Sequence, residues 1–289
     1  MGKEDNTTGE YMRNHEIAAD LLNYKIYGGE LKIIPEKLRE LDTTSIVNLS
    51  NTTPDGKEDI ESVKRDRDVL KKVTALQDGR NTYLIIGIEN QTLIHYAMPT
   101  RTMLYDALQY DDQVKVIHKA HKAKETKDNC KEKTGENSKR RTGDEYISRF
   151  YKEDKIMPVV TFVVYWGNKR WDGPTSMKEM MYEIDEEIEP YVQDYKLFLI
   201  APNEMEDHEF RKMKTSLGEV FQYIKYSKDK KRLAEIVAGN ERYKHLEREA
   251  VMVINSVTKS NIPLKEEEEE INMCQALEEM KEDAREEGR

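Results

Sequence analysis

Residues 82–88 (Thr-Tyr-Leu-Ile-Ile-Gly-Ile) form a short, nearly continuous apolar run that begins after a turn at Gln77–Asn81. Such a run is typical of a strand that is covered on both faces. Two further apolar runs, at residues 157–165 and 195–201, predict strands of the same kind. Helical and strand patterns alternate along this part of the chain, so the sequence predicts an α/β protein with a mixed sheet flanked by helices.

The remaining elements follow from local periodicity. Apolar residues recur at helical spacing in 14–24, where Asn14 can cap the helix, and in 99–110. Residues 67–74 alternate weakly and suit a strand, and Pro35 is expected to open a short helix over 35–41. Residues 48–58 have the composition of a loop.

The organisation of the chain is predicted in three parts. Residues 1–13 are expected to be a disordered lead-in, 14–203 an α/β domain, and 204–289 a helical extension. Within the domain, the lysine-rich segment 118–145 has few apolar residues and is expected to be a flexible insertion. Within the extension, the sequence pattern predicts helices at 206–226, 228–238, 240–259 and 271–289. The last of these could continue as a coiled coil that joins copies of the chain.

Charge is distributed unevenly along the chain. The formal net charge is −10, but residues 1–180 hold 30 acidic and 30 basic side chains, so the whole excess lies in 181–289. Residues 114–141 hold ten Lys or Arg against four acids. Phosphate binding depends on a local basic surface, so this balance is compatible with DNA binding without supporting it.

Several classes of protein are disfavoured. No apolar run reaches the roughly 18 residues of a membrane helix, so no membrane partner is expected. Residues 1–13 lack the apolar stretch of a secretory signal. Only Cys130 and Cys274 are present, far apart and without metal-ligand spacing, which is typical of a protein from a reducing cytoplasm.

Acidic and polar residues follow the strongest strand. Glu89 and Gln91 should point to one side of it, while the backbone carbonyl of Asn90 can turn inward. Asp68 lies 21 residues upstream, a spacing that suits two neighbouring antiparallel strands with both carboxylates near one sheet edge. Two carboxylates and a carbonyl suit a hard divalent cation that assists phosphodiester hydrolysis. The spacing alone is a weak signal, because a solvated Glu89 at a strand end would look the same.

Several segments in order carry a resemblance to a known family. The segments are Ala19-Asp20-Leu21-Leu22-Asn23, Arg67–Val73, Ile86–Thr92, Ile94–Arg101, Tyr105-Asp106-Ala107, Pro158-Val159-Val160, Tyr165-Trp166-Gly167, Trp171–Pro174 and Asn272–Leu277. Over about residues 14–285 the chain resembles the Rpn group of recombination-promoting nucleases, also described as PD-(D/E)XK nuclease family transposases. The likeness is strongest to variants from gut Firmicutes.

The resemblance implies a restriction-endonuclease-like fold and Mg²⁺-dependent DNA cleavage in a bacterial cytoplasm, with Mn²⁺ as a substitute metal. It implies that Asp68 and Glu89 are metal ligands and that Gln91 replaces the usual lysine that orients water. Glutamine at this position is normal in the Rpn group, but it cannot stabilise charge as lysine does, so Arg101 or Lys71 could assist. Asp66 competes with Asp68, although the match to Arg-Asp-Val favours Asp68.

Other residues keep two interpretations. Asp20 could be a third acid at the same edge or a solvated helix residue, and His95 could be a general base or structural. Phosphate contacts are candidates at Lys71, Arg101, Lys139, Arg140 and Arg141, the last three in a segment that could equally be a solvated loop. Core packing is expected of Met98, Tyr105, Tyr110, Trp166 and Trp171. The competing function is a catalytically inactive nuclease fold that acts as a DNA-binding or assembly module.

Overall fold

A computed structural model describes residues 3–41, 44–52, 58–66, 68–77, 80–131, 142–265 and 268–287. Its central sheet has five strands in the order β1-β4-β5-β6-β7. These strands are β1 (Arg39–Glu40), β4 (Val69–Gln77), β5 (Arg80–Gln91), β6 (Val159–Tyr165) and β7 (Phe198–Ile200). β1, β4 and β5 pair antiparallel, whereas β5, β6 and β7 pair parallel. The sheet is therefore mixed, as the sequence predicts.

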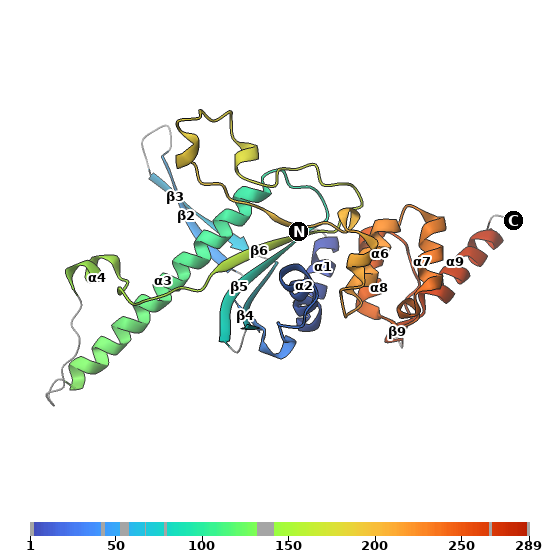
Figure 1. The fold of residues 1–289 in the computed structure, drawn as a ribbon, viewed down its shortest axis with the longest axis horizontal. Coiled ribbons are helices and arrows are strands. Elements are labelled where there is room, and N and C mark those ends of the chain that lie inside the picture. The colour runs from blue at the N-terminus through green and yellow to red at the C-terminus, as the bar shows by residue number, and fades with distance from the viewer. Residues whose placement is uncertain are drawn as a thin grey trace.

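Helices cover the sheet on both faces (Figure 1). The crossover from β5 to its parallel neighbour β6 runs through α3 (Met98–Lys131), since parallel neighbours require a long connection. Leu70 and Ile85 share a cluster with Tyr110 of α3, whereas Val69, Ile86 and Ile88 join the large core with α2 (His15–Tyr27). This arrangement is a restriction-endonuclease-like α/β fold, which confirms the predicted fold class.

Residues 1–13 were expected to be disordered, and that expectation is wrong for the described part, because Lys3–Arg13 form helix α1. Tyr11 and Met12 are buried in the large core, and the Tyr11 hydroxyl lies 3.0 Å from Ser216 Oγ. α1 packs against α8 (Arg248–Thr258) of the helical extension. A mostly polar helix of this kind is stabilised by what it packs on, so its own periodicity gives little signal.

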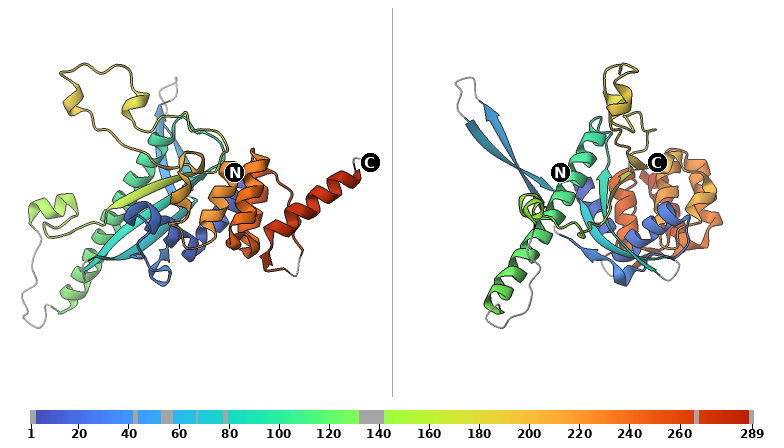
Figure 2. Two further views of the ribbon diagram at one scale, coloured as in Figure 1. Left: turned by 45° about the vertical axis from the view of Figure 1, so that its right-hand side comes forward. Right: turned by 60° about the vertical axis from the view of Figure 1, so that its left-hand side comes forward.

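The helical extension comprises α5 (Asp207–Phe210), α6 (Leu217–Tyr226), α7 (Lys230–Gly239), α8 and α9 (Met273–Glu287). The predicted helix 206–226 is thus split, and a short pair of strands, β8 (Leu246–Glu247) and β9 (Glu270–Ile271), was not expected. Residues of α6 and α8 share the large core with α1 and α2, so the predicted boundary at 203/204 does not separate two cores. Figures 1 and 2 show α9 reaching outward from this bundle. Its role as a coiled coil stays a prediction.

Three segments differ from their predicted structure. α3 continues to Lys131, well into the segment expected to be flexible, and α4 (Gly143–Ser148) follows, while 132–141 lie outside the described residues. Of the expected loop 48–58, residues 48–52 and 58 instead belong to the antiparallel strands β2 (Thr44–Thr52) and β3 (Glu58–Asp66), and 53–57 lie outside the described residues. The expected helix 35–41 is a 3₁₀ turn at Pro35–Lys37 followed by β1.

In the part of the chain that the structure describes, no helix is long and apolar enough to cross a membrane.

Candidate active site

Asp68 and Glu89 lie opposite each other on neighbouring strands. Val69 pairs with Ile88, so Asp68, one residue earlier, faces Glu89, one residue later, at the same end of the antiparallel pair. Directly opposed residues point to the same face of a sheet. Asp68 Oδ2 also accepts a hydrogen bond of 2.6 Å from the backbone N–H of Asn90. The register therefore places both acids at the same end of the strand pair, and their sharing of one metal ion stays a prediction. Asp66 ends β3 in a separate two-stranded sheet, whereas Asp68 leads directly into β4.

Both carboxylates are removed from solvent. Asp68 is 3 % exposed and Glu89 is 0 % exposed. A buried carboxylate is costly to keep charged unless hydrogen bonds, a nearby positive charge or a metal ion compensate for its desolvation. The first turn of α3 supplies such a charge: Arg101 Nη2 lies 3.3 Å from Glu89 Oε2. Burial lowers the pKa of the Arg101 guanidinium, but Glu89, Tyr105 and Asp68 outweigh it, so that pKa is raised overall.

Tyr105 completes the wall of the site on α3. Its hydroxyl accepts a hydrogen bond of 3.1 Å from Arg101 Nε, and the guanidinium also lies 5.4 Å from the centre of its ring. Burial, followed by the negative charge of Glu89, raises the pKa of the phenol. Tyr105 therefore stays protonated at neutral pH and holds Arg101 against the acidic pair.

The side chains of Asn90 and Gln91 point to opposite faces of β5. Asn90 faces the large core, where its Oδ1 accepts a hydrogen bond of 2.9 Å from Trp166 Nε1, and the Trp166 ring packs edge-on against Phe221. Gln91 shares a face with Glu89, and its Nε2 donates to the Asn90 carbonyl oxygen at 2.9 Å. The carbonyl predicted as a ligand therefore lies beside the amide predicted to orient water.

Lys71 does not lie where it could contact DNA or assist the two acids, the roles predicted from the sequence. It is 1 % exposed, and its Nζ donates to the Arg13 carbonyl at 2.8 Å. Its position three residues after Asp68 places it on the opposite face of β4. Burial lowers the pKa of its ammonium group. The expectation that Lys71 contacts DNA or assists the acids is corrected: it ties β4 to the end of α1.

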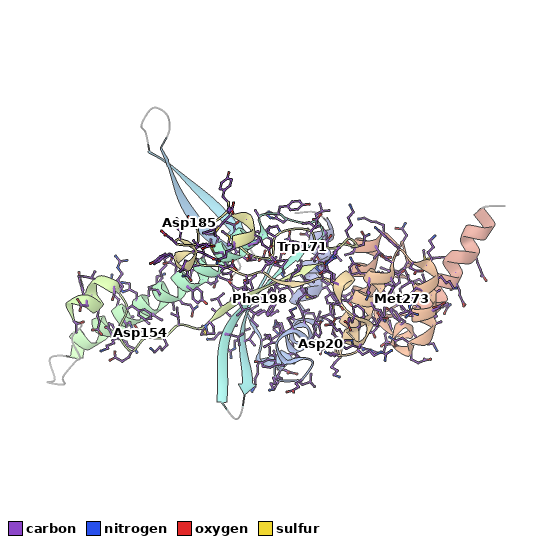
Figure 3. The ribbon with its side chains drawn as sticks, turned by 45° about the horizontal axis from the view of Figure 1, so that its top comes forward. Asp20, Asp154, Trp171, Asp185, Phe198 and Met273 are labelled. Carbon is purple, nitrogen blue, oxygen red and sulfur yellow. The ribbon has the colours of Figure 1, made fainter. Side chains whose placement is uncertain are left out.

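Asp20 is likewise not at the sheet edge. Its carboxylate is 5 % exposed and accepts hydrogen bonds from the backbone N–H groups of Lys214 and Thr215 and from the Thr215 hydroxyl, at 2.7–2.9 Å. Figure 3 shows Asp20 on α2, beside the helical extension. The expectation of a third metal ligand is corrected: Asp20 anchors the loop that precedes α6.

The other predicted residues fall into three groups. Lys139, Arg140 and Arg141 lie outside the described residues, and their contact with DNA stays a prediction. His95 is exposed, with its backbone carbonyl accepting a hydrogen bond from Met98 N. Core packing is confirmed for a set of buried or half-buried side chains: Met98, Tyr105, Tyr110, Trp166 and Trp171.

A further buried acid lies on the same face of the sheet as Glu89. Asp106 of α3 is 4 % exposed, and its carboxylate accepts a hydrogen bond of 2.5 Å from Thr161 and another from the Tyr195 hydroxyl. Thr161 pairs with Gly87, two residues before Glu89. Asp106 belongs to a segment that resembles the Rpn group, but local pattern gave no reason to expect this contact.

Among the described residues, no group of three or more His, Cys, Asp or Glu is placed to hold a metal ion.

Comparison with known proteins gives one match. Residues 144–250 match the model of a family described as "Putative transposase, YhgA-like", which is of the PD-(D/E)XK, Rpn type. This match confirms the resemblance seen in the sequence. It extends from α4 to α8 and does not include Asp68 or Glu89. No curated protein and no solved structure matches the chain.

Proposed function

We propose that this protein is a metal-dependent DNA endonuclease of the recombination-promoting, transposase-like type. The observation that carries the proposal is the buried pair of Asp68 and Glu89 at one end of two antiparallel strands, with the first turn of α3 beside it. The match of residues 144–250 to a transposase family supports the same class of activity.

The donor atoms at this edge fit a hard divalent cation. Two carboxylates and the Asn90 carbonyl are the oxygen ligands that Mg²⁺ prefers, and Mn²⁺ accepts the same set. Asp68 and Glu89 would hold the ion, with the Asn90 carbonyl as a further donor. A bound Mg²⁺ would supply Lewis-acid activation of the scissile phosphate and of the attacking water.

The protein's own residues have separate roles in this proposal. Gln91 would orient the attacking water through its amide, since it lies on the same face as Glu89 and next to the Asn90 carbonyl. Arg101 would move from Glu89 to the phosphate that carries the developing negative charge, because a guanidinium binds phosphate oxygens in a fixed planar geometry. Tyr105 would hold the Arg101 side chain at the site through its hydroxyl and ring.

A second candidate is a catalytically inactive nuclease fold that binds DNA or acts in assembly. A specific observation favours it: Arg101 is paired with Glu89, and Gln91 donates to the Asn90 carbonyl, so groups that would bind metal are engaged by the protein itself. The two candidates differ in whether a divalent cation displaces these contacts.

Cleavage of supercoiled plasmid separates the two candidates. Wild type, Asp68→Asn and Glu89→Gln are compared in Mg²⁺, Mn²⁺ and EDTA, with Glu209→Gln as a matched control outside the sheet edge. Glu209 is hydrogen-bonded to Tyr24 in the helical region, so its substitution keeps the acidic pair intact. We expect metal-dependent nicking that both site variants lose and the control retains.

Calorimetric titration with Mg²⁺ provides a readout that does not depend on turnover. Binding by wild type that is lost in both site variants is expected for the nuclease. Equal nicking by the site variants would refute the assigned site. Absence of both Mg²⁺ binding and nicking in wild type would favour the inactive fold.

A further inference from the structure

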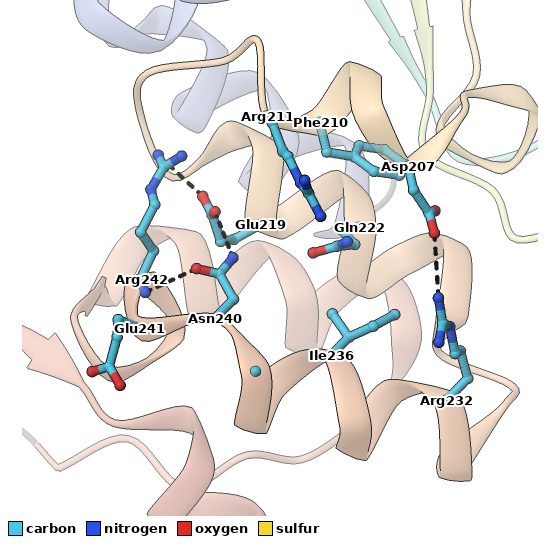
Figure 4. Close-up of a pocket in the computed structure, with 11 residues that line it drawn as sticks. Asp207, Phe210, Arg211, Glu219, Gln222, Arg232, Ile236, Asn240, Glu241 and Arg242 are labelled. Atoms are coloured by element: carbon cyan, nitrogen blue, oxygen red, sulfur yellow. Dashed lines mark hydrogen bonds and ion pairs between the residues drawn. The ribbon is translucent and has the colours of Figure 1, made fainter.

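A polar pocket of roughly 480 Å³ lies within the helical extension, apart from the acidic pair (Figure 4). Its walls come from α5, α6, α7 and the segment that follows α7. Charged and polar side chains dominate the lining, among them Asp207, Arg211, Glu219, Gln222, Arg232 and Arg242. Its volume lies within the range of about 300–1,000 Å³ that is typical of small-molecule sites.

One end of the pocket is a fixed structural wall. Glu219 is 4 % exposed, and its carboxylate lies 3.1 Å from Arg242 Nη2 and accepts a hydrogen bond of 3.1 Å from Asn240. Arg242 also donates to the carbonyls of Met213 and Lys214 at 3.3 and 3.0 Å. Burial raises the pKa of Glu219, and Arg242 opposes that shift. Arg242 is therefore engaged by its own chain and is not the group that would meet a ligand.

The other acids of the pocket are also neutralised by neighbours. Asp207 accepts a hydrogen bond of 2.5 Å from the Tyr226 hydroxyl and lies 3.5 Å from Lys225 Nζ and from Arg232 Nη2. Glu241 pairs with Lys244 at 2.8 Å. The acidic residues therefore do not make the pocket repulsive to an anion.

Arg211 differs from the other arginines of the pocket. Within the described part of the chain, its guanidinium makes no hydrogen bond or ion pair, and Figure 4 shows it extending from the end of α5 toward Gln222. The Gln222 Oε1 accepts from the Tyr243 hydroxyl at 3.4 Å, so its amide nitrogen is the end available to donate. Arg232 lies on the α7 wall, with ion pairs of 3.5 Å to Asp207 and Glu235 and its guanidinium 5.9 Å from the centre of the Tyr226 ring.

We infer that this pocket binds a phosphate group through Arg211, Arg232 and Gln222. Guanidinium groups bind phosphate oxygens in bidentate fashion, and these donors approach from the walls of α5, α6 and α7. A tetrahedral phosphate presents oxygens in several directions at once, whereas a carboxylate presents two in one plane. The volume exceeds that of a bare phosphate, so the group belongs to a nucleotide-sized ligand or to the backbone of a nucleic acid.

The inference is tested on the full chain in EDTA, where metal-dependent cleavage is absent. Binding of inorganic phosphate and adenosine monophosphate is measured by calorimetry, and binding of a fluorescein-labelled single-stranded 12-mer by polarisation. Arg211→Gln and Arg232→Gln are compared with Arg170→Gln, an arginine outside the pocket whose side chain is 88 % exposed. Melting curves check folding, and Arg211→Gln should melt as wild type because the Arg211 guanidinium makes no hydrogen bond or ion pair with the described residues.

We expect Arg211→Gln to weaken phosphate-group binding about tenfold or more, because a charge-assisted hydrogen-bonding partner is lost. Arg170→Gln should bind as wild type. Loss of adenosine monophosphate binding in the pocket variants would identify a small phosphorylated ligand. Loss of 12-mer binding alone would identify the nucleic-acid backbone as the source. Equal binding by wild type and Arg211→Gln to every probe, or no binding of any probe, would overturn the inference, and neither result bears on the acidic pair.

Discussion

Removal of the Arg101 guanidinium tests whether it is the counter-charge of the acidic pair. Glu89 has no exposed surface, Arg101 is 31 % exposed by side chain, and the two groups are 3.3 Å apart. Removing one partner of a fully buried ion pair costs about 3–5 kcal/mol. Since the guanidinium is partly solvated, we expect Arg101→Ala to lower the free energy of unfolding by about 2–3 kcal/mol without divalent ions. Arg101→Lys keeps the charge and should lose less.

Urea unfolding, followed by the fluorescence of the buried Trp166 and Trp171, measures this effect in EDTA and then at rising Mg²⁺. A cation at the acidic pair competes with the guanidinium, so Mg²⁺ should stabilise Arg101→Ala more than wild type. Each tenfold gain in Mg²⁺ affinity adds about 1.4 kcal/mol at saturating ion. An unfolding free energy within about 0.5 kcal/mol of wild type in EDTA, or an equal Mg²⁺ increment in both proteins, would refute the reasoning.

Three further predictions concern residues away from the acidic pair. Asp20→Ala should lower the free energy of unfolding by about 2–4 kcal/mol, because two backbone N–H groups and a hydroxyl lose a charged acceptor, while Mg²⁺ affinity stays unchanged. Unchanged stability with lost Mg²⁺ affinity, measured by urea unfolding and calorimetry, would restore Asp20 as a ligand. Lys71→Met should keep wild-type DNA affinity and salt dependence in a polarisation titration, since its ammonium is buried; a weaker, less salt-dependent complex would contradict its assignment. The hydrogen bond from Tyr226 lowers the pKa of Asp207 below its ordinary 3.8, so the ionised carboxylate stabilises the fold above that value and this stability is lost as pH falls through the lower folded-state pKa. Tyr226→Phe should raise the pKa of Asp207 and move that loss to higher pH, as read from an NMR titration of its carboxyl carbon; an unchanged midpoint would rule out the hydrogen bond as the cause.

The acidic edge could be predicted because its signals are local. An apolar run marked β5, a turn marked the reversal before it, and the two-residue period of a strand placed Glu89 and Gln91 on one face. The same period excludes Lys71, which is an odd number of residues from Asp68 and so faces α1. The strand period alone therefore argues against a contact between Lys71 and the two acids.

The role of Asp20 could not be predicted in this way. Its hydrogen-bond partners are Lys214 and Thr215, 194 and 195 residues further along the chain. A buried carboxylate that anchors a distant loop has the same local pattern as one that faces solvent or metal, because helical periodicity reports burial and not the partner. Helix α1 could not be predicted for a similar reason. The helix is stabilised by contacts with distant parts of the chain, namely the hydrogen bond between Tyr11 and Ser216 and the packing of α1 against α8.

The site places its positive charge on a helix and not on the strand. Position 91 holds a neutral amide, and the charge beside Glu89 comes from Arg101, ten residues later on α3. If this cation replaces the strand lysine of the wider superfamily in the proposed reaction, the two positions should be coupled. Gln91→Lys in wild type adds a second cation and should slow cleavage or leave it unchanged. In Arg101→Ala, which should cleave at least tenfold more slowly, the same substitution should restore much of the lost rate. Plasmid nicking by the four proteins of this cycle measures the coupling, and purely additive effects would mean that Arg101 stabilises the fold without serving the reaction.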